Sequence, residues 1–217
     1  MAYTLFYFPG NANLAPHMAL EEIGIPYELA LLDRANAEHK SAPYLARNPT
    51  GRIPTLLAPQ PDGNEETVFE TAAILLHLAD KHPEANLAPA PGAPGRGRFL
   101  TWLFHLTNTI QPEYRVFYYP EQHVTDPAHG ADAKATAERR LCQMFDLVDR
   151  ELATRPYIAA DHLTVADFLL LMLVRWGRNF THPPRDLPHL GRLCAELLAR
   201  PSVQRTFAQE GLGAPFI

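Results

Sequence analysis

The spacing of apolar and polar residues follows two different patterns along this chain, and one pattern gives way to the other near residue 90. In the first part, short apolar runs of strand character are predicted at 4–8, 27–32, 55–58 and 66–69. Stretches with an apolar residue every three to four positions predict helices at 14–23, 42–47 and 71–82. The resulting order, βαβαββα, indicates an α/β unit with a crossover first and a hairpin second.

Turn and capping residues agree with these boundaries. Asn13 stands at the N-cap position of the first helix, Pro16 falls in its first turn, and Gly24 follows its last residue. The segment 60–64 has the composition of a hairpin turn, and Pro83 ends the helix that begins near residue 71. The local signals therefore support the same set of elements as the apolar pattern.

A linker separates this unit from a second part in which no strand pattern is found. Four prolines and three glycines lie between His82 and Gly97. Beyond them, helical spacing predicts helices at 99–118, 131–153, 163–178 and 190–198. We expect an α/β domain at 1–82, a linker at 83–97 and an all-helical bundle at 98–217.

One local motif in the second part has a structural meaning. Thr164 and Asp167 have the spacing of a capping box, with a hydroxyl at the N-cap and a carboxylate at the third helical position. Leu163 and Phe168 are placed to form the flanking hydrophobic staple. We interpret the motif as the start of a buried helix.

Charge and composition narrow the classes of function. The chain of 217 residues has a net charge of −5 and no local cluster of Lys and Arg, which makes nucleic acid an unexpected partner. No run approaches the roughly 18 apolar residues that span a bilayer, so no membrane partner is expected. The first eight residues resemble no signal peptide, and we expect a cytoplasmic protein.

The cysteines and histidines give no sign of a metal site. Cys142 and Cys194 are 52 positions apart, which is the spacing of neither a disulfide framework nor a usual ligand pair. The ten histidines form no HExxH or similar arrangement. We expect two buried thiols and no metal.

The segment 48–56, together with Glu70 and Thr71, predicts a site for a small peptide. A cis bond at Ile53-Pro54 costs little at a turn and can aim the backbone of Ile53 outward, where an extended ligand pairs with it. Glu70 offers a carboxylate for an ammonium group. Thr71 offers a hydroxyl and the first N–H groups of a helix for a carboxylate, so the pair suits the head of an α-amino acid.

Several segments together resemble those of cytosolic glutathione transferases, with the beta class and its bacterial neighbours as the nearest match. The segments are Tyr7-Phe8-Pro9, Leu14-Ala15-Pro16-His17, Glu38-His39-Lys40-Ser41, Asn48-Pro49-Thr50-Gly51-Arg52-Ile53-Pro54, Glu70-Thr71-Ala72-Ala73-Ile74 and Leu163-Thr164-Val165-Ala166-Asp167. The resemblance implies a thioredoxin-like N-terminal domain followed by a helical domain that contributes a hydrophobic substrate site. It also implies a homodimer and a role in detoxification.

The resemblance also implies contacts to glutathione, which would be a co-substrate. Ile53 would pair through its backbone with the cysteinyl residue, and Pro54 would fix that geometry. Glu70 and Thr71 would bind the γ-glutamyl amino and carboxylate groups. The glycine carboxylate would meet three cationic candidates, for each of which an ordinary surface role is the alternative: His39, Lys40 and Arg52.

The chain departs from the beta-class pattern at the first helix. Where that class carries Cys-Ser, this sequence has Ala12 and Asn13, which excludes a mixed disulfide with the protein there. Asn13 is the first candidate to stabilise the thiolate, although a plain N-cap role fits it as well. Tyr7 is the second, with core packing as its alternative. Gln111 stands where the beta class often has a histidine.

For the second substrate, the helical domain offers a polar and aromatic set. Its members are Gln111, Tyr114, Phe117, Tyr118 and Trp176. Aromatic side chains suit an electrophile with a flat apolar body, and a helical core is the alternative use of the same pattern.

Three functions are compatible with these features. The leading hypothesis is a glutathione transferase that conjugates the thiolate to a small hydrophobic electrophile. A glutathione-dependent peroxidase or disulfide reductase would use the same donors on a different electrophile. A non-catalytic glutathione-binding or regulatory protein would keep the pocket without turnover.

Overall fold

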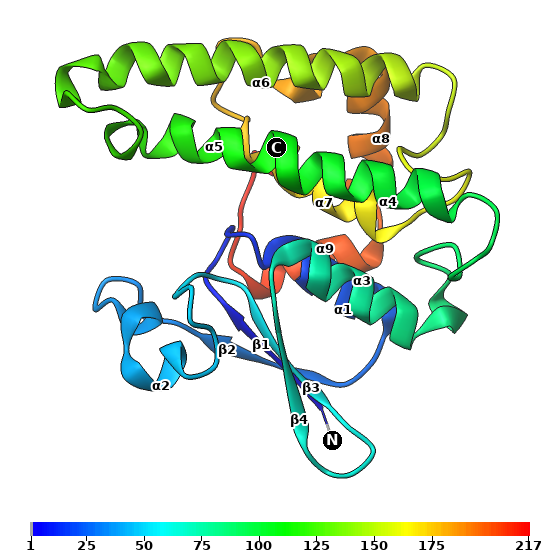
Figure 1. Cartoon of the computed structure of the whole chain (residues 1–217). Coiled ribbons are helices and arrows are strands. Elements are labelled where there is room, and N and C mark those ends of the chain that lie inside the picture. The colour runs from blue at the N-terminus through cyan, green and yellow to red at the C-terminus, as the bar shows by residue number, and fades with distance from the viewer. Residues whose placement is uncertain (1) are drawn as a thin grey trace. The chain divides into compact units, whose positions relative to one another are not determined.

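The computed structural model describes residues 2–217, and its N-terminal part contains a four-stranded sheet of order β2-β1-β3-β4 (Figure 1). The strands are β1 (Tyr3–Tyr7), β2 (Tyr27–Leu31), β3 (Thr55–Pro59) and β4 (Glu65–Phe69). β1 and β2 run parallel, as a crossover requires, whereas β1 with β3 and β3 with β4 are antiparallel. The predicted crossover and hairpin are both confirmed.

The predicted helices of this part are confirmed within one or two residues. They are α1 (Leu14–Ile23), α2 (Ala42–Leu45) and α3 (Thr71–Lys81), with short 3-10 turns at Glu38–Lys40 and Pro83–Ala85. Gly24 ends α1 in the left-handed conformation at φ 76°, and its N–H bonds the carbonyl of Leu20.

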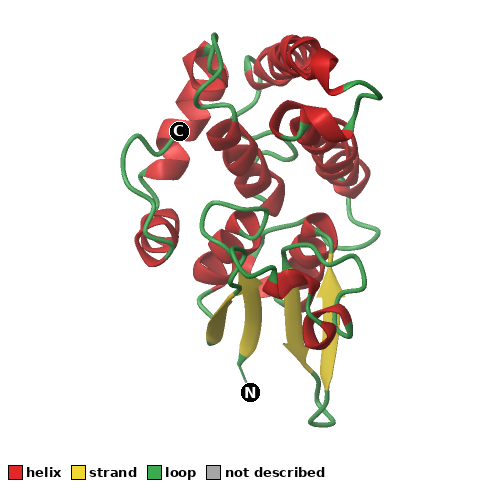
Figure 2. Ribbon diagram, turned by 90° about the vertical axis from the view of Figure 1, so that its left-hand side faces the viewer, coloured by secondary structure: helices red, strands yellow, loops and turns green. Residues whose placement is uncertain are grey.

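The two faces of the sheet are covered by different helices. Leu5 and Leu56 pair across β1 and β3 and are fully buried on the face where α1 and α3 lie side by side (Figure 2). Side chains alternate along a strand, so the neighbours Phe6 and Thr55 point the other way. There the ring of Tyr44 from α2 meets Phe6 edge-on, and its hydroxyl lies 2.8 Å from Thr55 Oγ1.

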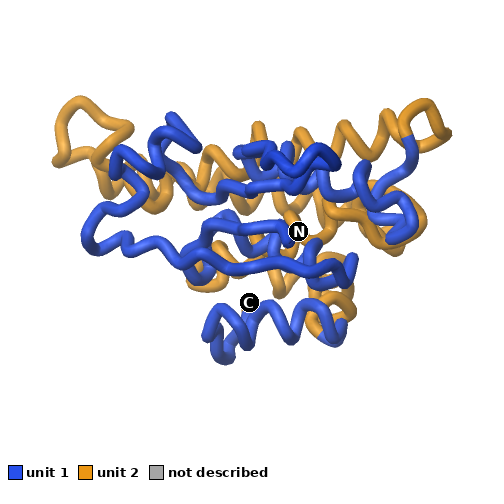
Figure 3. The backbone as a smooth tube through the Cα atoms, turned by 90° about the horizontal axis from the view of Figure 1, so that it is seen from below, with its two compact units in different colours: residues 1–90, 199–216 blue, residues 91–198, 217 orange. Residues whose placement is uncertain are grey.

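A helix from the C-terminal end of the chain completes this first unit. Residues 1–90 group with 199–216, and α9 (Pro201–Gln209) packs on α1 (Figure 3). Val203 and Phe207 form its buried face, while Arg200 and Arg205 pair with Glu22 and Glu21 of α1, respectively. Helix α9 is not among the helices predicted from the sequence.

The second unit spans residues 91–198 and is helical. Its helices are α4 (Arg96–His105), α5 (Gln111–Tyr118), α6 (Gly130–Leu152), α7 (Val165–Trp176) and α8 (Pro188–Leu198). Short 3-10 turns lie at Pro120–Gln122, Pro127–His129 and Pro184–Asp186. The helix expected at 99–118 is interrupted by a π-helical turn at Leu106–Ile110, where the N–H of Gln111 bonds the carbonyl of Leu106 five residues back.

Helix α7 is the core of this unit. Residues 165–175 are all buried, and Thr164 and Asp167 form the predicted capping box at its start. Asp149 of α6 accepts hydrogen bonds of 2.8 Å from the N–H groups of His189 and Leu190, which satisfies two free donors at the start of α8. None of the helices formed by residues 2–217 is long and apolar enough to cross a membrane.

Candidate functional site

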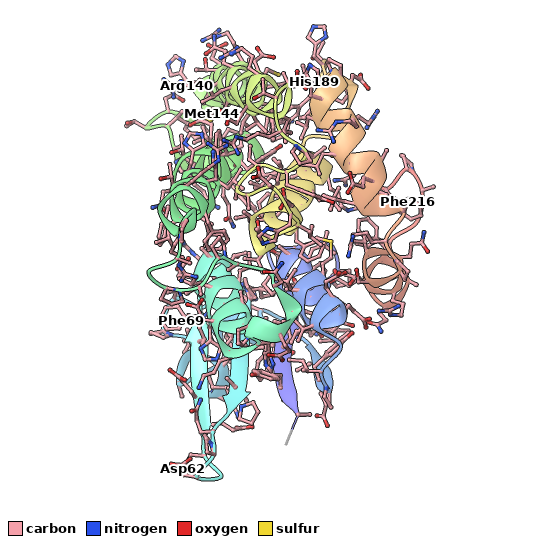
Figure 4. All side chains as sticks on the ribbon, turned by 90° about the vertical axis from the view of Figure 1, so that its right-hand side faces the viewer. Asp62, Phe69, Arg140, Met144, His189 and Phe216 are labelled. Atoms are coloured by element: carbon pink, nitrogen blue, oxygen red, sulfur yellow. The ribbon has the colours of Figure 1, made fainter. Side chains whose placement is uncertain are left out.

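Strand register brings three separate segments of the first unit to one edge of the sheet. Phe6 of β1 pairs with Thr55 of β3, and Thr55 pairs with Phe69 of β4, which is labelled in Figure 4. The chain leaves β1 and β4 at this row and enters β3 there. Tyr7, Ile53-Pro54 and Glu70-Thr71 therefore project from the same edge.

The loop before β3 is held by buried polar side chains. The Asn48 amide donates to the carbonyl of Arg52 at 3.0 Å and to Thr55 Oγ1 at 2.9 Å. The Tyr44 hydroxyl donates to the same Arg52 carbonyl at 2.5 Å. The Asn48 oxygen accepts from the N–H and hydroxyl of Thr50, which closes the turn. These bonds turn the Arg52 carbonyl inward.

The next residue keeps its backbone groups available. The Ile53-Pro54 bond is cis. Within residues 2–217 neither the N–H nor the C=O of Ile53 makes a hydrogen bond, although both lie beside the paired strand β3. A buried backbone normally satisfies such groups, so the half-buried Ile53 presents one donor and one acceptor to a ligand.

Glu70 adopts a backbone conformation that side chains rarely accept. It lies at φ 74°, ψ 124° immediately before α3, and its side chain is exposed. A non-glycine residue in such a region costs about 1–3 kcal/mol and is found most often at functional sites. The strain makes Glu70 a candidate for a role beyond the fold.

Thr71 links the starts of two helices. Its side chain is buried, and its hydroxyl donates to the carbonyl of Ala12 at 3.3 Å. The hydroxyl is therefore engaged with the α1 turn, while the N–H groups that open α3 lie next to the turn that opens α1.

Asn13 occupies the N-cap position of α1, as predicted, but its side chain does not cap the helix. Its backbone is helical at φ −71°, ψ −18°, and its side chain makes no capping bond. Instead the fully buried amide accepts from the N–H of Phe8 at 3.1 Å and donates to Glu210 Oε1 at 2.8 Å. The backbone N–H of Asn13 makes no hydrogen bond within the described residues, so it is a donor at the helix entrance.

Tyr7 ends β1 at the same edge. Its side chain is half-buried, and its hydroxyl has no hydrogen-bond partner among residues 2–217. The group can therefore donate to a ligand.

The three cationic candidates differ in their contacts with the rest of the protein. Lys40 Nζ donates to the carbonyls of Gly51 at 2.8 Å and Thr50 at 3.4 Å, so it braces the loop. Arg52 is exposed. Burial, together with the charges of Lys40 and Arg34, lowers the pKa of His39, whose buried Nδ1 has no partner in the described chain.

In the second unit, the predicted substrate residues split between core and surface. Tyr114 is buried among aromatic rings and donates its hydroxyl to the carbonyl of Leu173 at 2.6 Å, and Phe117 is also buried. Tyr118 is 46% exposed and donates to the carbonyl of Trp176 at 2.5 Å. Gln111 and Trp176 are half-buried.

One buried residue of the first unit is not among the predicted site residues. The carboxylate of Glu210 is fully buried and accepts from the N–H of Gly10 at 2.7 Å and from the amide of Asn13. It also lies 2.8 Å from Nδ1 of the buried His17. Its position directly after the amphipathic segment 201–209 is the only signal that could have indicated it.

The expectation of two buried thiols is confirmed for Cys194 only. Cys194 is buried, and burial raises the pKa of its thiol to about 12. Cys142 is half-buried, and burial likewise raises its pKa. Residues 2–217 contain no group of three His, Cys, Asp or Glu side chains placed to hold a metal ion.

Comparison with known proteins places these features in a family. Residues 1–80 match the family described as Glutathione S-transferase, N-terminal domain, and residues 107–201 match Glutathione S-transferase, C-terminal domain. A sphingomonad glutathione S-transferase, solved in complex with glutathione, is 31% identical with a TM-score of 0.82 and covers 97% of this chain and 100% of its own.

Two further relatives are also glutathione S-transferases. A bacterial beta-class glutathione S-transferase from Sphingomonas chungbukensis is 30% identical with a TM-score of 0.83, covering 97% and 100% of the two chains. Glutathione S-transferase GstA of Escherichia coli O157:H7 is 28% identical over 209 residues, which is 96% of this chain and 98% of that protein.

Proposed function

This chain belongs to the glutathione S-transferase family, and on that premise we propose that it binds glutathione and transfers the thiolate to an electrophilic carbon of a small hydrophobic compound. The observation that carries the proposal is the convergence at one sheet edge of the unpaired Ile53 backbone with the strained Glu70 and the start of α3. The glutathione bound to the sphingomonad relative supports it.

The proposed contacts follow from the chemistry of the groups. Ile53 pairs with the cysteinyl backbone as an added strand does. The exposed carboxylate of Glu70 pairs with the γ-glutamyl ammonium, and the N–H groups opening α3 at Thr71 bind its carboxylate. Arg52 and His39 are candidates for the glycine carboxylate, with Lys40 supporting the loop between them.

Catalysis in this proposal is the stabilisation of a thiolate. A free thiol has a pKa near 8.5, and lowering it by two units requires about 2.7 kcal/mol of selective stabilisation of the anion. The backbone N–H of Asn13 at the positive end of α1 and the hydroxyl of Tyr7 are the donors with capacity for it. No protein thiol takes part.

The electrophile is assigned to the helical unit. Gln111, Tyr118 and Trp176 supply accessible surface, while Tyr114 and Phe117 support it from the core. Flat apolar electrophiles fit such a surface.

Calorimetry with glutathione tests the binding half of the proposal. Glu70→Ala should weaken affinity about 10- to 100-fold, because a hydrogen bond to a charged group is worth about 1.5–3 kcal/mol. Thr71→Ala keeps the backbone N–H groups that open α3 and loses only the hydroxyl bonded to Ala12, so it should weaken affinity less. Glu65→Ala and Thr67→Ala, exposed residues of β4, are matched controls and should bind as the unaltered chain does. Equal affinity in all four variants would remove the head-group assignment.

Three substrates separate the reactions. A chlorinated aromatic compound should be conjugated, whereas an organic hydroperoxide or a glutathione-capped disulfide turned over faster would favour a peroxidase or a reductase. Tight binding of glutathione without turnover of any of the three would favour a non-catalytic protein.

A further inference from the structure

The buried His17 has acceptor groups at both of its ring nitrogens. Its side chain is fully buried in the first turn of α1. Nδ1 lies 2.8 Å from the carboxylate of Glu210, and Nε2 lies 2.6 Å from Oε1 of Gln209 and 3.1 Å from the hydroxyl of Tyr27. Whether each partner can donate a hydrogen bond or only accept one decides how many protons the imidazole ring carries.

The orientation of the Gln209 amide is fixed by a second carboxylate. Gln209 Nε2 donates to Glu21 Oε1 at 2.9 Å, and Glu21 also accepts from the Tyr27 hydroxyl and from Arg205 Nε. A carboxylate only accepts, so the amide must turn its NH2 group toward Glu21. Its oxygen, which cannot donate, then faces His17. The reversed amide would oppose two oxygens on the Glu21 side.

The role of Tyr27 follows from the same rules on donors and acceptors. Its single proton is used toward an acceptor, either Glu21 or the Gln209 oxygen, which lies 2.7 Å away. The phenolic oxygen therefore faces His17 as an acceptor. A neutral imidazole would place a lone pair against one of these acceptors, at Nδ1 or at Nε2.

We infer that His17 is held as an imidazolium, and that it serves as the counter-ion that keeps the buried Glu210 from opposing a thiolate at the start of α1. Glu210 binds the turn directly, through the N–H of Gly10 and the amide of Asn13. A like charge nearby disfavours an anion, and a buried carboxylate without a partner is only weakly screened by water. Paired with an imidazolium, it fixes the turn without adding net charge.

The position of the thiolate in this inference rests on the proposed function. The charge state of His17 is independent of the proposed function. The charged or titratable groups around the ring are Glu210 and Tyr27 in contact, with Glu21 and Arg205 in the next layer on α1 and α9. His17 is a positioning residue in this scheme, because it acts through Glu210 and Asn13.

Nitrogen-15 NMR of the full chain without ligand tests the charge state. At about pH 7.5, where a free imidazole is mostly neutral, both ring nitrogens of His17 should give protonated signals. The exposed His123 and His129 provide the reference signals of accessible rings in the same sample. A neutral tautomer at His17 would overturn the inference without any variant being made.

Titration of the bound glutathione thiol by its ultraviolet absorbance tests the consequence. His17→Gln should raise the thiol pKa by about one unit, because it leaves the Glu210 charge uncompensated. Glu210→Gln should shift it in the opposite direction, and the double variant should return toward the unaltered chain.

The directions in which the three variants shift the thiol pKa distinguish this role from a purely structural one. If the network only supports the fold, all three variants shift the thiol pKa the same way and the double variant is the worst, which would contradict the inference. Absence of glutathione binding in the unaltered chain would instead remove the proposed function, while the NMR result on His17 would stand.

Discussion

Gly51 is the residue at which the proposed peptide-binding loop has the least room. It lies at φ 58°, and a Cβ there would come within 2.8 Å of Lys40 Nζ and 2.9 Å of the carbonyl of His39. Both the backbone conformation and the contact with Lys40 therefore depend on the missing side chain.

Replacement of Gly51 by alanine should lower the free energy of unfolding by about 1–3 kcal/mol. Gly97→Ala is the matched control, since a Cβ at this position in α4 meets nothing within 4 Å, and it should stabilise the chain by about 0.5–1 kcal/mol. Urea unfolding of both variants measures the difference. Equal stability of the two would contradict the account of the loop.

Single residues also mark where sequence reasoning stops. The positions of Ile53, Glu70 and Thr71 could be predicted because the strand order alone brings them to one edge. The role of the Asn13 side chain could not, because an asparagine before a helix suggests a local cap. Its actual partner, Glu210, lies 197 positions away in the chain. Local preference gives no information about such a contact.

At the scale of elements, the start of α7 has a titratable group at its centre. Burial raises the pKa of the Asp167 carboxyl to about 6, against hydrogen bonds from the N–H of Ile158 and from the N–H and hydroxyl of Thr164. The folded state thus binds this proton more tightly than the unfolded chain does, with its pKa of 3.8. The associated stabilisation is complete below about pH 3.8 and is lost as the pH rises through 6.

Asp167→Asn isolates this effect, because asparagine does not titrate. The difference in unfolding free energy between the unaltered chain and the variant should fall by about 2 kcal/mol from pH 4 to pH 7. Thermal or denaturant unfolding across this range checks it. A difference that stays constant, or grows with pH, would contradict the assignment.

The helices also differ in how well they could be predicted from the sequence. Helices with strong apolar spacing, such as α1, α3 and α6, could be bounded from the sequence. The helix α9 was overlooked, although Pro201 at its start and the spacing of Val203 and Phe207 are consistent with a helix. The π turn at Leu106–Ile110 left no sign, because one added residue in a turn hardly alters the apolar spacing.

At the scale of the whole molecule, the sheet unit is discontinuous in sequence. Every residue from Leu14 to Leu20 of α1 is buried, and α9 supplies part of that cover. The family resemblance could predict two folds in succession. It did not indicate that residues 199–216 group with the first of them.

Residues 1–90 expressed alone should therefore fail to form a stable sheet. Joining 199–216 to them through a flexible linker should restore it, because the apolar face of α9 and Glu210 again cover α1. The dispersion of amide NMR signals compares the two fragments. Well-dispersed spectra from residues 1–90 alone would show that α9 is dispensable.

The position of Glu210 has a consequence for biosynthesis. Glu210 is synthesised 200 residues after Gly10, so its carboxylate does not yet exist when the first strand and helix leave the ribosome. The turn at Gly10 and Asn13 therefore stays without this anchor until α9 and Glu210 have been made. A nascent chain that stalls before Glu210 lacks the contact that fixes the start of α1.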